Sequence, residues 1–135
     1  MKKEDLKERT LQFCVRIVHM VDKMTDEVTT DFITEQLLKS CISVGARYNA
    51  ACRPSSARDF INRLKLVEDA AYESVFWLDL IEACNIFPPE KIKDLKQEAN
   101  ELLSIFVASI STARKNLRLK TKKEPEQQLH KVAEK

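Results

Sequence analysis

The chain has 135 residues, a formal net charge of +2, a charged fraction of 33%, one glycine and four cysteines. This length suits a single domain with its own core, and one glycine excludes the glycine-rich loops of Rossmann and P-loop proteins and disfavours a sheet. We therefore predict an all-helical protein. The cysteines form no CxxC pair and no apolar run has the length of a signal peptide or a membrane span, so the reducing cytoplasm is the expected compartment.

Apolar residues recur at spacings of three and four over residues 5–24, which predicts a first helix with one buried face. A polar segment follows, and a second helix is expected over residues 31–52. It carries an apolar seam and, beside it, a seam of small residues. The seams are Ile33, Leu37, Ser40, Val44, Arg47 and Ala51, and then Leu38, Cys41, Gly45, Tyr48 and Cys52. Glycine costs a helix about 1 kcal/mol relative to alanine. We therefore expect Gly45 to allow close contact with another helix; the alternative is a tolerated glycine without a role.

Pro54 ends the second helix, because proline disfavours a helical residue before it. Ser56 followed by Asp59 resembles a capping box for a third helix over residues 57–84. This helix has a core seam and a second apolar seam that a helix with one buried face does not need. We expect another subunit to cover the second seam; the alternative is a central position in the bundle. The predicted oligomer interface comprises Gly45, Tyr48, Leu66, Ala70, Trp77 and Leu80.

Pro88 and Pro89 mark the start of a fourth helix, since proline is favoured at a first helical position, and its apolar periodicity ends near Leu117. Four long helices with short links predict an all-α, up-down-up-down four-helix bundle over residues 1–117. Residues 118–135 are basic and poor in apolar side chains, so we expect a mobile C-terminal tail, into which the fourth helix can extend.

Charge is divided unevenly between the two ends of this predicted bundle. Short links make neighbouring helices antiparallel, so the turn between the second and third helices shares one end with both chain termini. At that end, segments 1–9, 47–65 and 111–123 carry a net charge of +11, while segments 22–35 and 79–93 at the other end carry −5. The residues that we call the basic cap are Arg53, Arg58, Arg63, Arg114, Lys115, Arg118, Lys120, Lys122 and Lys123.

A basic cap of this kind suits the phosphates of RNA or DNA, whose neutralisation makes binding dependent on salt. The alternative is a solvated basic tail that complements the dipole of the fourth helix. The sequence contains no interleaved aromatic residues for base stacking and no RNA-recognition or DNA-reading motif.

The residues that enzymes of this architecture use are absent. Di-iron sites in helix bundles need Glu-x-x-His pairs on facing helices, and neither His19 nor His130 belongs to one. Cys41 and Cys52 lie about 16 Å apart along their helix, too far to share a metal, and are expected to be buried as small hydrophobic residues. We predict no enzymatic activity, no cofactor, no metal, no small-molecule substrate and no membrane partner.

Glu73 is a carboxylate on an otherwise apolar seam, where it needs a hydrogen bond or neutralisation. An antiparallel pair that turns near Pro54 places Glu73 level with Gln36 and Arg47 level with Asn62, one turn from Asp59. We therefore predict a structural Gln36–Glu73 pair, with a ligand-binding role for Glu73 as the alternative, and an ion pair between Arg47 and Asp59.

Three strings carry a family resemblance: SCISVGARY at residues 40–48, DFINRL at 59–64 and ESVFWLDLI at 73–81. In this order and spacing they resemble the four-helix-bundle family of 23S rRNA intervening-sequence proteins, also labelled S23 ribosomal proteins, over roughly residues 6–117. The chain departs from the family in having Arg47 where many relatives have asparagine, and Ala50 and Ala70 where glutamate is frequent.

The resemblance implies a closed ring of five bundles and a function in nucleic-acid binding. No enzymatic activity is established for the family. The same bundle occurs in the accessory variability proteins of diversity-generating retroelements, which bind a reverse transcriptase, and this is the second possibility. We therefore expect a non-enzymatic, cytoplasmic homo-oligomer that binds RNA or DNA through its basic cap, or a protein adaptor.

Overall fold

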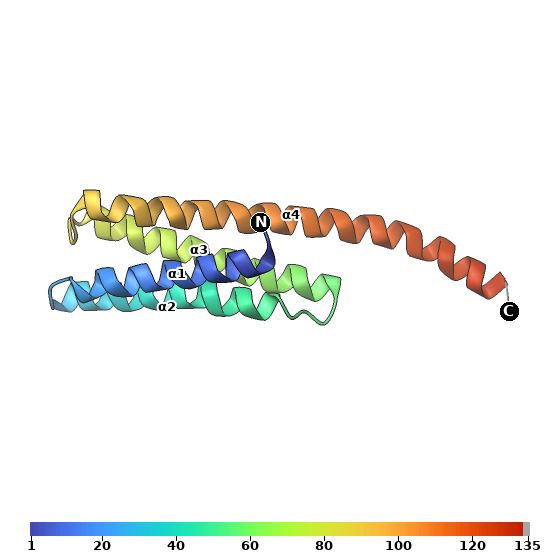
Figure 1. Cartoon of the computed structure of the whole chain (residues 1–135), viewed down its shortest axis with the longest axis horizontal. Helices are drawn as coiled ribbons and strands as arrows, with labels where there is room; N and C mark the ends of the chain where they lie inside the picture. The colour runs from blue at the N-terminus through green and yellow to red at the C-terminus, as the bar shows by residue number, and fades with distance from the viewer. Residues whose placement is uncertain (134–135) are drawn as a thin grey trace.

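The computed structural model describes the backbone of residues 1–133 and the side chains of residues 1–122. This part of the chain is helical and contains no strand. The helices are α1 (Lys3–Asp22), α2 (Val28–Ala51), α3 (Ala57–Ala83) and α4 (Pro89–Ala133). They lie side by side, each antiparallel to the next along the chain (Figure 1). The predicted all-helical class and the four predicted helices are confirmed.

The core lies between the four helices and follows the predicted apolar periodicity. Of the six residues in the apolar seam of α2, only Arg47 is exposed; the core seam of α3 is buried from Leu64 to Ile81. Removing these side chains from water is the main favourable contribution to folding. The largest fully buried apolar side chains are Phe13, Phe106, Ile17, Leu37, Leu64, Leu78, Ile81, Ile92, Leu102, Val44 and Val67.

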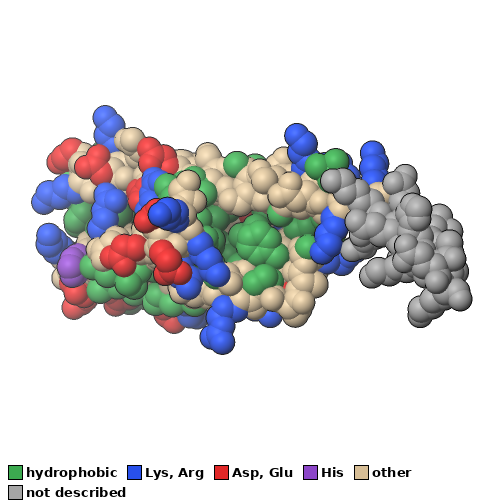
Figure 2. Space-filling view, turned by 45° about the vertical axis from the view of Figure 1, so that its right-hand side comes forward, with side chains coloured by type: hydrophobic (Ala, Val, Ile, Leu, Met, Phe, Trp, Pro, Cys, Tyr) green, Lys and Arg blue, Asp and Glu red, His purple; other side chains and the backbone are tan. Residues whose placement is uncertain are grey.

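The helices contact one another to different extents. The α2–α3 and α3–α4 contacts are the most extensive, and the α1–α4 contact is the smallest. A groove therefore follows the α1–α4 seam, lined by residues that include Arg9, Gln97, Asn100 and Ile105. On the face drawn in Figure 2, apolar side chains form the floor of a hollow. The bundle is least well closed between its first and last helices.

Local sequence signals explain where the helices begin and end. The Ser56 hydroxyl accepts a hydrogen bond from the Asp59 amide at 3.0 Å, and the Asp59 carboxylate accepts one from the Ser55 amide at 2.9 Å. The predicted cap of α3 is therefore present. After α3, Asn85 has a φ of 54°, a left-handed conformation that asparagine tolerates better than most residues.

The fourth helix is longer than its apolar periodicity predicts. Instead of ending near Leu117 it continues to Ala133. The helical backbone continues through Pro125, although an interior proline lacks the N–H of one helical hydrogen bond and costs about 3 kcal/mol relative to alanine. The mobility of the tail stays a prediction. Beyond the bundle, α4 projects as a single helix (Figure 1).

Within the described residues, none of the helices combines the length and the hydrophobicity needed to cross a bilayer.

Candidate nucleic-acid interface

The structure brings most of the predicted basic cap to one end of the bundle. Lys96 forms ion pairs with Asp79 at 2.9 Å and Glu82 at 3.1 Å, which fix the register between α3 and α4. At that register Arg118 lies level with the first turn of α3, where Arg58 is. Figure 2 shows Lys and Arg side chains gathered at this end. The exposed members are Arg53, Arg58, Arg114, Lys115, Arg118, Lys120 and Lys122; the Lys123 side chain lies outside the described residues.

One face of α4 carries a regular basic stripe. Arg114, Arg118 and Lys122 follow one another at intervals of four residues, with Lys115 beside them. Residues four apart lie on the same helix face, so the stripe extends over about 12 Å of helix. Like charges at this spacing repel by about 0.2–0.5 kcal/mol per pair. A bound polyanion would remove that repulsion.

The structure corrects the predicted cap at Arg63, because this side chain forms hydrogen bonds within the chain. Its Nε donates to the Asp59 carboxylate at 2.8 Å and its Nη1 donates to the Ala50 carbonyl at 2.9 Å. The hydrogen bond from the Ser55 amide and the nearby Arg63 charge hold the pKa of Asp59 below its ordinary value. Arg63 thus ties the end of α2 to the start of α3, and Asp59 offsets its charge.

The opposite end of the bundle is mixed in charge. Asp22, Asp26 and Glu27 are exposed there, as the sequence predicts. However, a cleft between the end of α1 and the start of α4 also gathers basic side chains, among them Arg16 and Lys91. Figure 2 shows acidic and basic side chains interspersed at that end. The two ends differ in charge mainly because the basic cap has few acidic neighbours.

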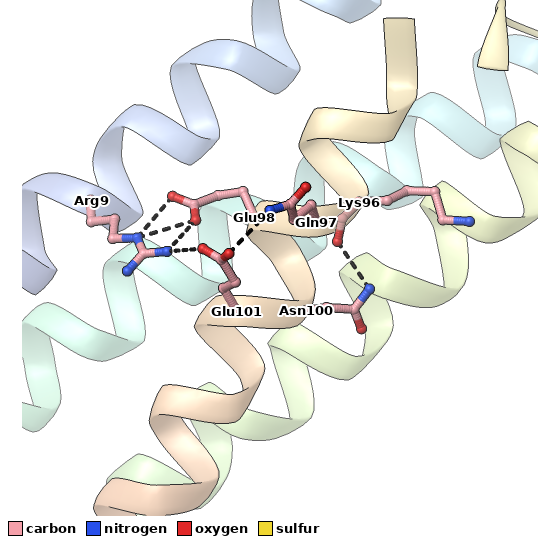
Figure 3. Close-up of polar contacts among 6 residues, drawn as sticks. All are labelled: Arg9, Lys96, Gln97, Glu98, Asn100 and Glu101. Atoms are coloured by element: carbon pink, nitrogen blue, oxygen red, sulfur yellow. Dashed lines mark hydrogen bonds and ion pairs between the residues drawn. The ribbon is translucent and has the colours of Figure 1, made fainter. Parts of the chain in front are cut away.

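An ionic cluster bridges the open seam between α1 and α4 (Figure 3). Arg9 Nε donates to both carboxylate oxygens of Glu98, at 3.0 and 3.1 Å, and Arg9 Nη2 lies 2.6 Å from Glu101 Oε2. The hydrogen bond to Glu98 raises the pKa of Arg9. The sequence pattern did not indicate this cluster, because its members are about ninety residues apart in the chain.

The predicted polar contacts between α2 and α3 are displaced by about one helical turn. The partner of the Glu73 carboxylate is Ser40, whose hydroxyl lies 3.4 Å from Oε2, rather than Gln36, and Glu73 is exposed. Arg47 Nη1 lies 3.4 Å from the Leu66 carbonyl and does not pair with Asp59. Both predictions were wrong because Arg63 of α3 lies against Ala50 at the end of α2, so the first turn of α3 extends past α2 and the register is shifted by about one turn from that of a tight turn at Pro54.

Three residues of the predicted oligomer interface are buried within the chain. Gly45 packs against α1, Tyr48 packs against Phe106 with ring centroids 5.8 Å apart, and Ala70 is also buried. Because none of the three reaches the surface, their assignment to a subunit interface is corrected.

An apolar surface does remain on α3. Leu66 is exposed, Trp77 and Leu80 are partly buried, and the exposed Phe76 packs edge-to-face on Trp77 at 5.1 Å. We call Leu66, Phe76, Trp77 and Leu80 the α3 outer face. Phe76 was not predicted at this surface, because it lies one position outside the heptad seam that contains Trp77.

No group of three or more potential metal-ligating side chains occurs in the described part of the chain. The four cysteines are free thiols; Cys41 and Cys52 are buried as predicted, Cys14 is half-buried and Cys84 is exposed.

Comparison with known proteins agrees with this geometry. A family model described as 23S rRNA-intervening sequence protein matches residues 2–108. The chain belongs to this family. A crystal structure of a protein of unknown function from the S23 ribosomal protein family, from Bacteroides thetaiotaomicron, is similar with a TM-score of 0.75 and 28% identity. Among curated proteins, none matches the sequence significantly.

The match also delimits what this member shares with its family. The match to the intervening-sequence family model ends at residue 108. The alignment with the similar crystal structure includes 99% of that chain but only 82% of this one. The basic stripe on α4 begins at Arg114 and therefore lies outside the matched range. Family membership therefore accounts for the helix bundle. The function of the basic stripe has to be inferred from the chemistry of its side chains.

Proposed function

We propose that this intervening-sequence protein is a non-enzymatic, homo-oligomeric protein that binds the phosphate backbone of RNA or DNA through its basic cap. The observation that carries the proposal is the convergence, at one end, of Arg53 and Arg58 with the stripe formed by Arg114, Arg118 and Lys122. The family description, which names an rRNA intervening sequence, supports a nucleic-acid setting.

The chemistry of the cap favours binding without sequence preference. Arginine and lysine contacts to phosphates position a protein on nucleic acid but carry no sequence information directly. Each neutralised phosphate releases counterions and adds about −0.9 to the slope of log affinity against log salt for duplex DNA, and about −0.7 for single strands. The exposed cap residues would therefore give a binding constant that falls steeply with salt.

Oligomerisation would multiply this modest affinity. By resemblance to the family, we propose a ring of five chains that meet through the α3 outer face. Cyclic symmetry directs the same end of every bundle to the same side of a ring, so the caps would share one face. Several caps on a long polyanion raise avidity without any new type of contact.

The proposal is tested by charge neutralisation in a matched pair of variants. The stripe variant carries Arg114→Gln, Arg118→Gln and Lys122→Gln. The control variant carries Lys23→Gln, Lys91→Gln and Lys93→Gln, three exposed lysines at the opposite end. Binding to labelled duplex DNA, duplex RNA and a single strand is measured by fluorescence anisotropy between 50 and 200 mM salt.

We expect the stripe variant to bind at least about tenfold more weakly, and its salt slope on duplex DNA to be smaller by about 0.9 for each phosphate that the variant leaves unneutralised. The control variant should bind as the wild type does. Binding that is independent of salt, or equal reductions in affinity for the two variants, would contradict the cap as the binding surface.

A further inference from the structure

A cleft remains open at the end of the bundle opposite the basic cap, between residues 16–23 and residues 87–95. It lies on the α1–α4 seam, where the contact between neighbouring helices is least extensive. Its volume is about 380 Å³, which falls within the range of roughly 300–1,000 Å³ found for small-molecule sites. We call it the end cleft.

The floor of the end cleft is apolar. Met20 and Leu95 are each only 5% exposed, and Phe87 is partly buried beside them. The Lys91 ammonium lies over the Phe87 ring, 5.9 Å from its centroid. A thioether, a phenyl ring and an ammonium group all make favourable contacts with an aromatic ring. The floor therefore suits a flat aromatic group better than an aliphatic one.

The walls of the end cleft carry charges without a partner among the described side chains. The cations are Arg16, Lys23 and Lys91, the carboxylates are Glu90 and Asp94, and all five are exposed. None of them belongs to an ion pair within residues 1–122. Three cations and two carboxylates leave one positive charge, with the neighbouring histidine neutral. The walls therefore suit a ligand that has one negative charge and also offers a hydrogen-bond donor to a carboxylate.

We propose that the end cleft binds a small aromatic carboxylate that also carries an N–H or O–H group. The ring lies on the apolar floor. The carboxylate faces Arg16, whose planar guanidinium can donate two parallel hydrogen bonds to it, and Lys23 and Lys91 add to the positive potential. The donor group of the ring faces Glu90 or Asp94. This site lies at the other end of the bundle from the basic cap and does not depend on the proposed nucleic-acid binding.

The test compares ligands that differ in one feature at a time. Indole-3-acetate has the ring, one carboxylate and one N–H group. Indole-3-ethanol keeps the ring and the N–H group without the charge, acetate keeps the charge without the ring, and adenosine 5′-monophosphate replaces the carboxylate by a phosphate. Each is titrated into the full-length chain labelled with ¹³C in the methionine methyl groups. The chain has three methionines; Met20 reports the floor of the cleft, and Met1 is the internal control.

We expect indole-3-acetate to shift the Met20 methyl resonance along a saturable curve, with a dissociation constant of about 1 mM or lower, as is usual for a ligand of this size. The Met1 resonance should not move. Indole-3-ethanol, acetate and adenosine 5′-monophosphate should each bind at least about tenfold more weakly. A Met20 resonance that does not respond to indole-3-acetate would overturn the inference. Equal binding of indole-3-ethanol or of the phosphate would exclude the carboxylate as the recognised group.

A matched pair of variants tests the contribution of the guanidinium. Arg16→Gln should weaken the binding of indole-3-acetate about fivefold or more, because it removes the charge-assisted hydrogen bonds, and should leave indole-3-ethanol unaffected. Lys93→Gln is the control, since Lys93 is exposed near the start of α4 but does not line the end cleft; it should bind as the wild type does. Equal losses in the two variants would show that only the general charge of this end matters and would contradict the site.

Two further measurements separate the outcomes. Circular dichroism checks that Arg16→Gln is folded, and the comparison of the four ligands on the wild type decides the question if it is not. The variant with Arg114→Gln, Arg118→Gln and Lys122→Gln should bind indole-3-acetate as the wild type does. Loss of carboxylate binding in that variant would contradict a site that is independent of the basic cap.

Discussion

At the residue scale, charged side chains help to hold α1 against α4, whereas apolar packing holds the other neighbouring helices together. The α1–α4 seam has the least extensive helix contact, and Arg9 crosses it to reach Glu98 and Glu101. The Glu98 side chain is largely buried and accepts hydrogen bonds from both Nε and Nη2 of one guanidinium. Such bidentate, partly buried pairs contribute more to stability than isolated surface pairs.

Glu98→Gln should therefore lower the free energy of unfolding by about 1 kcal/mol, because Arg9 keeps its bond to Glu101 and a neutral acceptor at residue 98 but loses its charge-assisted bonds to Glu98. Urea denaturation measures the change. Glu35→Gln is the matched control, since Glu35 pairs with Lys39 only on an exposed helix face; its effect should stay within about 0.5 kcal/mol. Equal effects of the two substitutions would show that the bridge does not hold the seam.

Asp59 gives the α2–α3 connection a dependence on pH. Its pKa is lowered from an ordinary value of 3.8, chiefly by the Ser55 amide and further by Arg63. Because the folded pKa is the lower one, the stabilisation is fully present above pH 3.8. It is lost as the pH falls from that value through the folded pKa.

We expect the free energy of unfolding to decrease in acid below about pH 4, and Asp59→Asn to weaken this decrease. Urea unfolding at a series of pH values between 2.5 and 6 measures both curves. If the two curves were parallel throughout, the hydrogen bonds to Asp59 would not be coupled to stability.

At the scale of the helices, the sequence predicted existence, direction and core faces well, because those follow from local periodicity. It predicted contacts between helices poorly. The partner of Glu73 was misplaced by about one turn, since the first turn of α3 extends past the end of α2 and local periodicity does not report this offset. The Arg9 cluster was not foreseen, because nothing local relates α1 to α4. The sequence left the end of α4 open, with an extension into the tail allowed, because periodicity reports burial and residues 118–122 of α4 are exposed.

The structure leaves room for a methyl group at Gly45 of α2. A methyl group there would make ordinary contacts, 3.6 Å from Cys14 Sγ and 3.9 Å from the Thr10 carbonyl. Close approach of α1 therefore does not require a glycine, contrary to the expectation from the sequence. Alanine is favoured over glycine in a helix by about 1 kcal/mol.

Gly45→Ala should thus raise the free energy of unfolding by up to about 1 kcal/mol, and Gly45→Leu should lower it, since a branched side chain would collide with α1. Thermal and urea unfolding measure both changes. Destabilisation by Gly45→Ala would indicate that the helices are closer than the structure describes.

At the scale of the whole molecule, the proposed ring can be tested apart from nucleic-acid binding. Five chains of 15.6 kDa give a native mass of about 78 kDa. Leu66 and Phe76 are 50% and 57% exposed, so replacing them removes surface and leaves the core intact. The combination of Leu66→Ser and Phe76→Ser should reduce the native mass with little loss of helix content.

Val107→Ser is the control, because Val107 is 43% exposed but belongs to α4 and is not part of the α3 outer face. It should leave the native mass unchanged. A wild-type protein with the mass of one chain would contradict the ring. A double variant that keeps the wild-type mass would place the subunit contact on another face.

The projecting end of α4 affects how the protein moves through solution. Residues 119–133 extend about 20 Å at 1.5 Å per residue, and α4 reaches past the other three helices (Figure 1). Such a rod raises frictional drag without adding much mass, so the chain should elute early in gel filtration and tumble anisotropically. Elution volume alone would therefore overstate the number of subunits, and light scattering is the sounder measure of stoichiometry.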